Sequence, residues 1–385
     1  MCLLAAVNQL GFGAVVPVLP LYARSFGVST SAIGLSIGVY GLARMLVSAP
    51  AAQISDRLGR RHALALGGLV TALGNLWCGL AGSYPEFVLA RFLAGAGAGL
   101  IVTTGQIVLA DITTPERRGR VMAIYQGVFI FAAGIGPLPG GLLAEYGGLA
   151  APFAAYSVAG VLAGVLAWAA VGETREAGGG AHAASRPSLA SQVRVLAGHR
   201  GFALVCLVSL VNAAARTGGL FNIVPLVGSG LGLTVAAIGF AMAMGSVMGL
   251  LVAYPSGMLV DHFGRKAVIA PATVITGASM LLFCVAPSFA WFVAASLVWG
   301  VASGIGGAAP ATYAADSAPR GMNATTMSMF RMVGDAGYVA GPLVLGLAAD
   351  LYGAQAALIG VAALLAATGA GFAALAPETY RGRGR

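Results

Sequence analysis

The sequence predicts an all-α membrane protein with twelve transmembrane helices in two pseudo-symmetric six-helix bundles. Hydrophobic residues make up 58% of the 385 residues, charged residues make up 9%, and the mean hydropathy is +0.89. This composition gives more apolar surface than a soluble core could bury. The apolar runs have the length of about 20 residues that a helix needs to cross the bilayer, and the short alternating segments of closed barrels are lacking. The whole pattern also repeats after 205 residues.

The apolar runs follow one another in order, separated by short polar or charged turns. We expect spans near 1–22, 32–53, 63–82, 86–108, 121–143 and 150–171 in the first copy, and near 202–227, 236–258, 267–286, 290–312, 324–347 and 354–375 in the second. Residues 175–200 are polar, basic and rich in Gly, Ala and Ser, which predicts a cytoplasmic linker. The six-helix bundles are therefore expected at 1–174 and 201–385, the second ending in a short basic tail.

The duplication is clearest at a charged turn, Ser55–Arg61 (SDRLGRR), which returns 205 residues later as Val260–Lys266 (VDHFGRK). Because a six-span unit has an even number of crossings, both copies enter the membrane in the same direction, as a parallel repeat. The same offset aligns Pro20 with Pro225, Pro50 with Pro255, Gly95 with Gly300, Asp111 with Asp316, Gly136-Pro137 with Gly341-Pro342, and Glu173-Thr174 with Glu378-Thr379.

The net charge is +9, and most of the basic residues lie in alternate loops between the predicted spans. The opposite loops carry Glu86, Glu145 and Asp350, and among basic residues only Arg24. By the positive-inside rule both termini are cytoplasmic in a plasma (inner) membrane, or stromal or matrix in an organelle, and no nucleic-acid partner is needed to explain the charge. Sixteen of the 21 basic residues share this side: Arg57, Arg60, Arg61, Arg117, Arg118, Arg120, Arg175, Arg186, Arg194, Arg200, Arg265, Lys266, Arg320, Arg381, Arg383 and Arg385.

The sequence gives little support for disulfides, a metal site, ATP hydrolysis or enzymatic activity. The four cysteines fall in predicted spans and the four histidines in cytoplasmic loops without metal-ligand spacing, so we expect neither a disulfide framework nor a metal site. The sequence has no G-x-x-x-x-G-K-[S/T] loop and a single lysine, Lys266, which argues against ATP-driven transport. We expect no enzymatic activity and no cofactor. The expected partners are the lipid bilayer and a small-molecule substrate, and the protein is expected to be a monomer.

The charged turns resemble the loop signature of the major facilitator superfamily, Gly-x-x-x-Asp-Arg-x-Gly-Arg-Arg, and the likeness to that family covers essentially the whole chain. The first copy fits from Asp56 onward, although Ala52 replaces the leading Gly. The second copy restores that glycine as Gly257, but His262 replaces the first Arg. The resemblance implies the twelve-span fold of this family.

Two further motifs resemble those of the family's drug/proton antiporters. Residues 91–99 (RFLAGAGAG) are similar to an Arg-and-glycine motif associated with proton coupling. Residues 136–141 (GPLPGG) are similar to the antiporter signature, with Ala132 in place of its upstream Gly. The first span, with Gly13, Pro17, Pro20, Tyr22 and Gly27, also resembles twelve-span antiporters.

The resemblance implies a conformational latch at the charged turns. In the outward-facing state Asp56 would face the positive end of span eleven, around residues 323–325. The alternative is that these charges only fix the topology. The candidate latch residues are Asp56, Arg57, Gly59, Arg60, Arg61, Asp261, Gly264, Arg265 and Lys266.

Two Gly-Pro pairs are candidates for helix bending. Proline removes a backbone donor and glycine allows close helix approach, so Gly136-Pro137 would kink or tighten span five, and Gly341-Pro342 would do the same to span eleven.

Four arginines and one acid remain inside the predicted spans: Arg44, Arg91, Arg216, Arg331 and Asp335. An arginine near the bilayer centre costs about 2.5–3.5 kcal/mol on insertion scales, so each is expected to face a wet cavity or a partner. Asp335 is the leading candidate for carrying protons, because no other acid is predicted in the membrane. The alternative is a static pair with Arg331 one turn earlier, which would hold the carboxylate ionised unless movement separates the two.

Arg91 is the candidate cationic counterpart of proton coupling, or else a structural arginine bonded to backbone carbonyls. Arg216 could hold an anionic substrate or pair with Asp335 across the two halves, and the sequence does not rank these. In this family, spans one, five and seven line the central cavity, although a polar residue there is more often an interhelical hydrogen bond. The substrate-cavity candidates are Asn8, Gln9, Arg44, Gln126, Arg216, Asn222 and Arg331.

The sequence thus predicts a secondary transporter that works by alternating access around a site near the midplane. By resemblance, its expected activity is export of a small organic molecule in exchange for protons. The alternative is uptake, or facilitated exchange, of an organic anion or other small metabolite, which the excess of buried arginines favours. A third class, a membrane receptor or scaffold that transports nothing, would be separated from these by transport in proteoliposomes.

Overall fold

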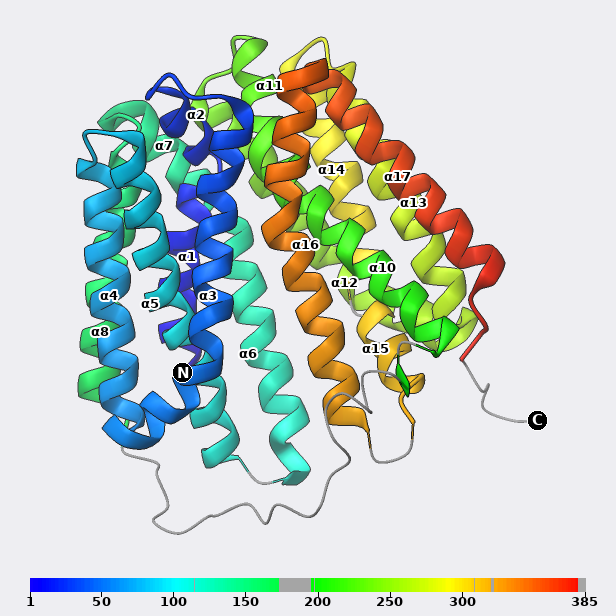
Figure 1. Ribbon diagram of the computed structural model, residues 1–385, viewed down its shortest axis with the longest axis horizontal. Coiled ribbons are helices and arrows are strands. Elements are labelled where there is room, and N and C mark those ends of the chain that lie inside the picture. Colours follow the sequence, from blue (N-terminus) through cyan, green and yellow to red (C-terminus); the bar gives the residue numbers. More distant parts are fainter. Residues whose placement is uncertain (114, 173–194, 197, 308, 320–321, 380–385) are drawn as a thin grey trace. The chain divides into compact units, whose positions relative to one another are not determined.

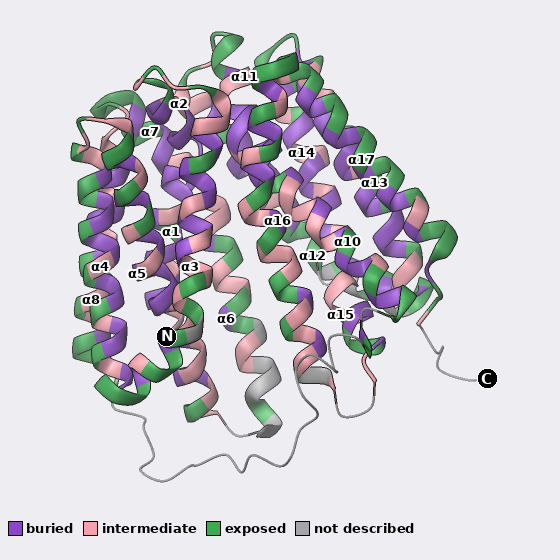
Figure 2. Ribbon diagram, in the orientation of Figure 1, coloured by how far each residue is buried: buried purple, intermediate pink, exposed green. Residues whose placement is uncertain are grey.

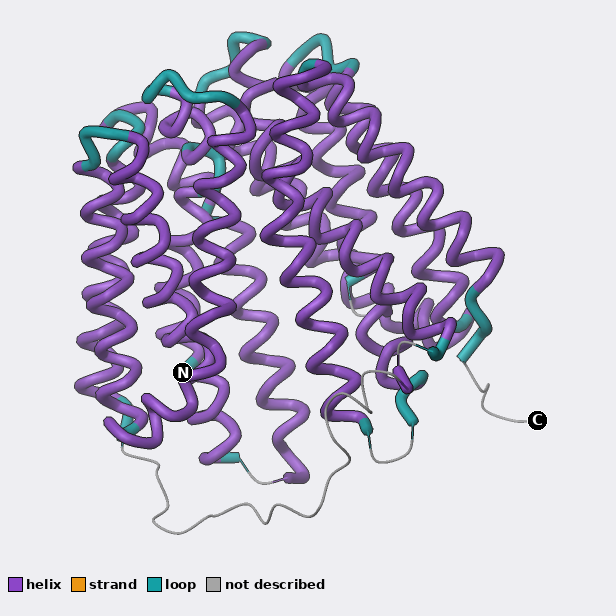
Figure 3. Tube along the Cα trace, in the orientation of Figure 1, coloured by secondary structure: helices purple, strands orange, loops and turns teal. Residues whose placement is uncertain are grey.

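The computed structural model describes residues 1–113, 115–172, 195–196, 198–307, 309–319 and 322–379. These residues form helices and connecting loops, with no strand among them (Figure 3). Their contacts group the chain into two compact units: unit 1 is Met1–Gly179 with Gly228–Ala243, and unit 2 is Gly180–Val227 with Met244–Arg385. Most of the linker predicted at 175–200 lies outside the described residues.

Unit 1 is a bundle in which α4 packs against both α5 and α8. Small residues allow this close approach, as is common between membrane helices. A Cβ added at Gly74 would lie 2.4 Å from the backbone nitrogen of Ala94, and one at Gly97 would lie 2.4 Å from that of Thr71. The helices of unit 1 are α1 (Cys2–Val15), α2 (Leu19–Arg24), α3 (Thr30–Leu58), α4 (Arg60–Leu80), α5 (Tyr84–Ile112), α6 (Pro115–Ile135), α7 (Pro137–Gly147), α8 (Ala151–Ala170) and the first part of α12 (Val235–Phe263) (Figure 1).

Unit 2 repeats the same order of helices, with α13 packed on α14 and α17, and α10 packed on α16. Its core includes Phe202, Val208, Tyr313 and Phe372, which are all buried. The helices of unit 2 are α10 (Arg200–Ala214), a π-helix η1 (Ala215–Ile223), the first half of α11 (Val224–Gly230), the remainder of α12, α13 (Arg265–Cys284), α14 (Phe289–Gly306), α15 (Ala309–Asp316), α16 (Asn323–Tyr352) and α17 (Ala354–Leu375).

The first span of each copy is not a uniform α-helix. In the first copy α1 ends at Val15, and the chain passes through a tight turn at Pro17 before α2 begins at Leu19. Proline lacks the backbone donor and its ring crowds the preceding turn, which explains the break. In the second copy the corresponding residues form the π-helix η1. The predicted span 121–143 consists of parts of α6 and α7, which meet at Gly136.

Eleven helical segments of the described chain are long and apolar enough to cross a membrane, and α1 is a shorter apolar helix. Exposed apolar side chains follow helical spacing on α4, where Leu66, Leu69, Leu73, Leu76 and Leu80 lie on the surface (Figure 2). Such a continuous apolar stripe would be a liability in water. It is the expected lipid-facing surface of a membrane helix.

Candidate functional site

Arg91 is buried within unit 1, with 2% of its surface exposed. It lies on α5, where its Nε donates a hydrogen bond to the backbone oxygen of Ser36 at 3.3 Å. Its guanidinium carbon lies 4.4 Å from the centre of the Tyr40 ring. Among the described residues, Nη1 has no hydrogen-bond partner. One carbonyl and one aromatic face therefore hold this cation, and the N–H groups of Nη1 remain able to donate hydrogen bonds.

A chain of polar side chains leads from Tyr40 to α1. The hydroxyls of Tyr40 on α3 and Tyr156 on α8 are 3.2 Å apart. The Tyr156 hydroxyl donates to Asn8 Oδ1 at 3.5 Å, and Asn8 Nδ2 donates to Gln9 Oε1 at 3.1 Å. All four side chains are buried, so the cluster connects α1, α3, α5 and α8 inside unit 1. Its centre, Tyr40 and Tyr156, was not among the candidates from sequence.

Among the side chains that the structure describes, the interior of unit 1 carries cations without acids. Arg44 is half-buried on α3, and the acids whose side chains are described lie near helix ends: Asp56, Glu86, Asp111 and Glu145. Gln126 on α6 is exposed. The Arg91 cluster is therefore positively charged, which favours neutral or acidic ligands over cations in its vicinity.

In unit 2, Asn222 is fully buried at the end of the π-helix η1. Its Nδ2 donates to the backbone oxygen of Pro342 at 3.2 Å, and its Oδ1 has no partner in the described chain. A Cβ added at Gly218 would lie 2.4 Å from the Gly341 oxygen, so η1 and α16 are in backbone contact. Short π-helical segments occur often at functional sites.

The charged candidates of unit 2 lie in two places. Arg216 on η1 is exposed, with its guanidinium carbon 5.5 Å from the centre of the Phe221 ring. Arg331 is exposed on α16, and Asp335 is half-buried one turn further along the same helix. The proton-carrying role of Asp335 stays a prediction.

The two Gly-Pro pairs differ in form. At Gly136 the chain passes from α6 to α7, and a Cβ there would lie 2.6 Å from the Cα of Gly13 on α1. Gly341-Pro342 lies inside the continuous helix α16, and a Cβ at Gly341 would lie 2.5 Å from the Cα of Ala214. Each pair thus lies at a close contact with the first span of its own copy.

The charged turn of unit 1 contains an ion-pair network in which one arginine contacts two acids. Arg60 Nη1 lies 2.5 Å from Asp56 Oδ1, and Arg60 Nε lies 3.0 Å from Asp111 Oδ2. Gly59 joins α3 to α4 with φ of 89°, a backbone conformation that side chains disfavour. Asp56 is thus paired inside its own unit, and its expected contact with span eleven stays a prediction.

The other basic residues of this turn differ in environment. Arg57 is exposed, and the guanidinium carbon of Arg61 lies 4.5 Å from the centre of the Trp168 ring.

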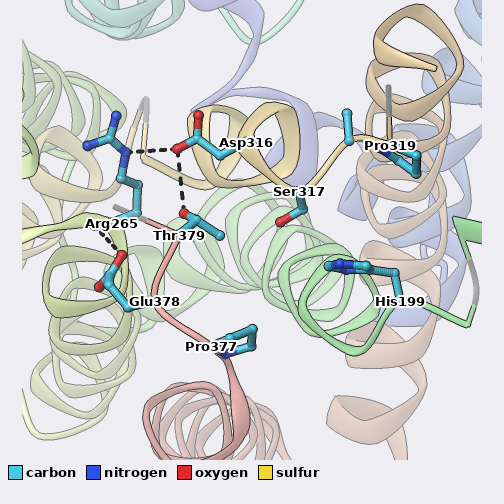
Figure 4. A pocket seen from close by; sticks show the side chains of 9 residues that line it. His199, Arg265, Asp316, Ser317, Pro319, Pro377, Glu378 and Thr379 are labelled. Atoms are coloured by element: carbon cyan, nitrogen blue, oxygen red, sulfur yellow. Dashed lines mark hydrogen bonds and ion pairs between the residues drawn. The ribbon is translucent and has the colours of Figure 1, made fainter. Parts of the chain in front are cut away.

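Unit 2 repeats the turn with the equivalent aspartate and with a second acid, Glu378. Arg265 Nε lies 3.0 Å from Asp316 Oδ2, and the Glu378 carboxylate accepts the backbone N–H groups of Arg265 and Lys266 at 3.2 Å each. These groups border a cavity of about 770 Å³ that His199 and Thr379 also line (Figure 4). The carboxylate therefore caps the start of α13. The side chain of Asp261 lies outside the described part of the chain.

Replacing Gly264 with alanine is expected to destabilise unit 2. Gly264 has φ of 92°, and an added Cβ would lie 2.8 Å from Glu378 Oε2. A left-handed backbone costs a side chain about 1–2 kcal/mol, and displacing the capping carboxylate adds to that cost. Thermal unfolding of purified protein in detergent measures the effect.

Gly353→Ala is the matched control, because Gly353 has φ of 90° but no atom within 4 Å of an added Cβ. An equal loss of melting temperature in the two variants would contradict the role given to Glu378.

The partners Asp111, Asp316 and Glu378 were not selected as site residues from the sequence. For the two aspartates the sequence did contain a signal. Asp111 and Asp316 are 205 residues apart, as are Arg60 and Arg265, the arginines that they bind. The separation of 51 residues between Arg60 and Asp111 does not show by itself that they meet.

The duplicated membrane helices, the interrupted spans and the buried intramembrane cation define a transporter rather than an enzyme. The chain belongs to the major facilitator superfamily, whose family model matches residues 1–250 and 205–385. The two overlapping matches follow the duplication in the sequence.

Similar proteins agree with this assignment. An uncharacterised MFS-type transporter of Methanocaldococcus jannaschii, MJ1560, is 23% identical over 351 residues, 90% of this chain and 89% of the relative. The quinolone resistance protein NorA of Staphylococcus aureus is 28% identical over 140 residues, 35% of each chain. A bacterial homologue of the human lysosomal transporter Spinster has a similar fold, with a TM-score of 0.82 at 17% identity, over 97% of this chain and 95% of that one.

Proposed function

We propose that this chain exports a small organic molecule in exchange for protons, by alternating access. The observation that carries the proposal is the buried Arg91, which a carbonyl and a ring hold in place while Nη1 keeps donors without a partner among the described residues. The partial similarity to a quinolone resistance protein supports export of drug-like molecules. Asp335 is the proposed proton carrier, and the arginine-rich loops are proposed to face the cytoplasm.

A second candidate is exchange of an organic anion without protons. It rests on the charges of the predicted spans, where four arginines stand against one acid. A site of this charge would favour carboxylates over the cationic compounds that many drug exporters move.

Proteoliposomes with an internal pH dye separate the two candidates. The wild-type protein is given an imposed pH gradient and three aromatic probes: ethidium as a cation, ciprofloxacin as a zwitterion and 2-naphthoate as an anion. We expect proton movement that depends on addition of a transported probe. Flux of 2-naphthoate without proton movement would replace the first proposal with the second, and absence of any probe-dependent flux would count against both.

A further inference from the structure

Helix α12 belongs by sequence to the second copy, yet residues 235–243 are grouped with unit 1 and its remainder with unit 2. One contact between this start of α12 and unit 1 is made with α7. A Cβ added at Gly141 would lie 2.6 Å from the Val235 oxygen, and one at Gly239 would lie 2.2 Å from the Pro137 oxygen. Neither position can hold a larger residue without separating the two backbones.

A carboxylate reinforces this contact. Glu145 Oε2 accepts the backbone N–H of Ala236 at 3.3 Å, while Thr234 Oγ1 accepts that of Ala237 at 3.2 Å. The first N–H groups of a helix have no partner within the helix, and negative charge is favourable beside them. Glu145 therefore caps a helix that lies 91 residues away in the sequence.

The position has a counterpart in the second copy. Asp350 occupies the same place in the repeat, and each acid lies two residues before the end of its helix, α7 ending at Gly147 and α16 at Tyr352. Both acids are on the side that lacks the arginine-rich loops. An acid at this place is therefore a feature of the repeated unit.

We propose that Glu145 is a gating residue of the transport cycle. Its carboxylate, together with the Gly141–Gly239 contact, holds α7 to the first turn of α12 while this end of the transporter is closed, and it releases Ala236 when this end opens. The inference rests on the alternating access of the proposed function, but it needs neither proton coupling nor a particular substrate. Loss of the proposed proton coupling would therefore leave it standing, and its own failure would leave the proposed function untouched.

The test is the rate at which a maleimide labels the thiol of an Ile238→Cys protein, because Ile238 is a fully buried residue in the first turn of α12. The full-length protein is reconstituted in nanodiscs, so the reagent reaches both sides, and Cys2, Cys206 and Cys284 are replaced with serine. Glu145→Gln is expected to raise the labelling rate roughly two- to fivefold, the shift in population that a carboxylate at a helix N-terminus produces. Gly239→Ala is expected to act in the same direction.

Two controls make the result specific. Glu86→Gln should leave the rate unchanged, because Glu86 lies in the first turn of α5 and its Oε2 accepts the N–H of Gly82 just before that helix, at 2.9 Å. Cys78, which is fully buried in unit 1, reports general unfolding and should stay unlabelled. If Glu145→Gln left the introduced thiol labelling at the rate seen without that change, or if labelling of Cys78 rose in parallel, the proposal would be overturned.

Discussion

Arg91→Lys is expected to reduce transport of whichever probe the wild-type protein moves by about 10- to 100-fold, although the positive charge is kept. Lysine lacks the planar guanidinium, so it loses the hydrogen bond to the Ser36 oxygen and the geometry over the Tyr40 ring. These two interactions together are worth about 1.4–2.7 kcal/mol, which corresponds to that range of rates. Initial rates in proteoliposomes, normalised to reconstituted protein, measure the change.

Two companion variants show which property of Arg91 matters. Arg91→Met removes the charge at similar length and is expected to abolish transport. Tyr40→Phe keeps the aromatic face under the guanidinium and removes only the hydroxyl next to Tyr156, so it should be milder than Arg91→Lys. A folded Arg91→Lys protein that transports at the wild-type rate would show that only a charge is needed at this position.

Asp335→Asn is expected to abolish substrate-dependent proton movement while leaving exchange of substrate across the membrane measurable. An amide cannot take up or release a proton, whereas the size and the polar character of the side chain are kept. The two activities are measured in the same vesicles, with the pH dye for protons and with counterflow of labelled probe for substrate. The expected outcome is a loss of coupling rather than a loss of transport.

Glu86→Gln is the control, because it also replaces an acid with its amide, and Glu86 lies in the first turn of α5 with its carboxylate bonded to the Gly82 N–H. It should keep both activities. If Asp335→Asn still moved protons as the wild type does, the coupling role would pass to another group. If it lost exchange as well, Asp335 would be assigned to binding or to folding instead.

The sequence predicted the helical membrane fold because that information is local. Apolar length, charge in alternate loops and a constant 205-residue offset can each be counted along the chain. The course of the chain within the first span was not predicted: it turns at Pro17, and the second copy forms a π-helix at the equivalent place. A proline weakens a helix predictably, but whether the chain bends, breaks or absorbs the change depends on the neighbouring helices.

The candidate site was partly visible in the sequence. An arginine inside an apolar span is conspicuous, so Arg91 could be selected by its type and position alone. Its partners could not, because the Ser36 carbonyl and the Tyr40 ring are ordinary features of another helix, 55 and 51 residues away. The same holds for Asp111, whose role as an ion-pair partner of Arg60 follows only from the tertiary structure.

By itself, the sequence determined that this is a duplicated, multi-spanning membrane protein, because hydrophobicity and periodicity act residue by residue. The tertiary structure alone decided which polar groups meet: the Tyr40–Tyr156 hydroxyl pair, the acids around Arg60 and Arg265, and the Glu145 cap on α12. Hydrogen bonds and ion pairs act over about 3 Å, so they depend on how helices pack. That packing is set by small residues such as Gly141 and Gly239, whose partners lie far away in the chain.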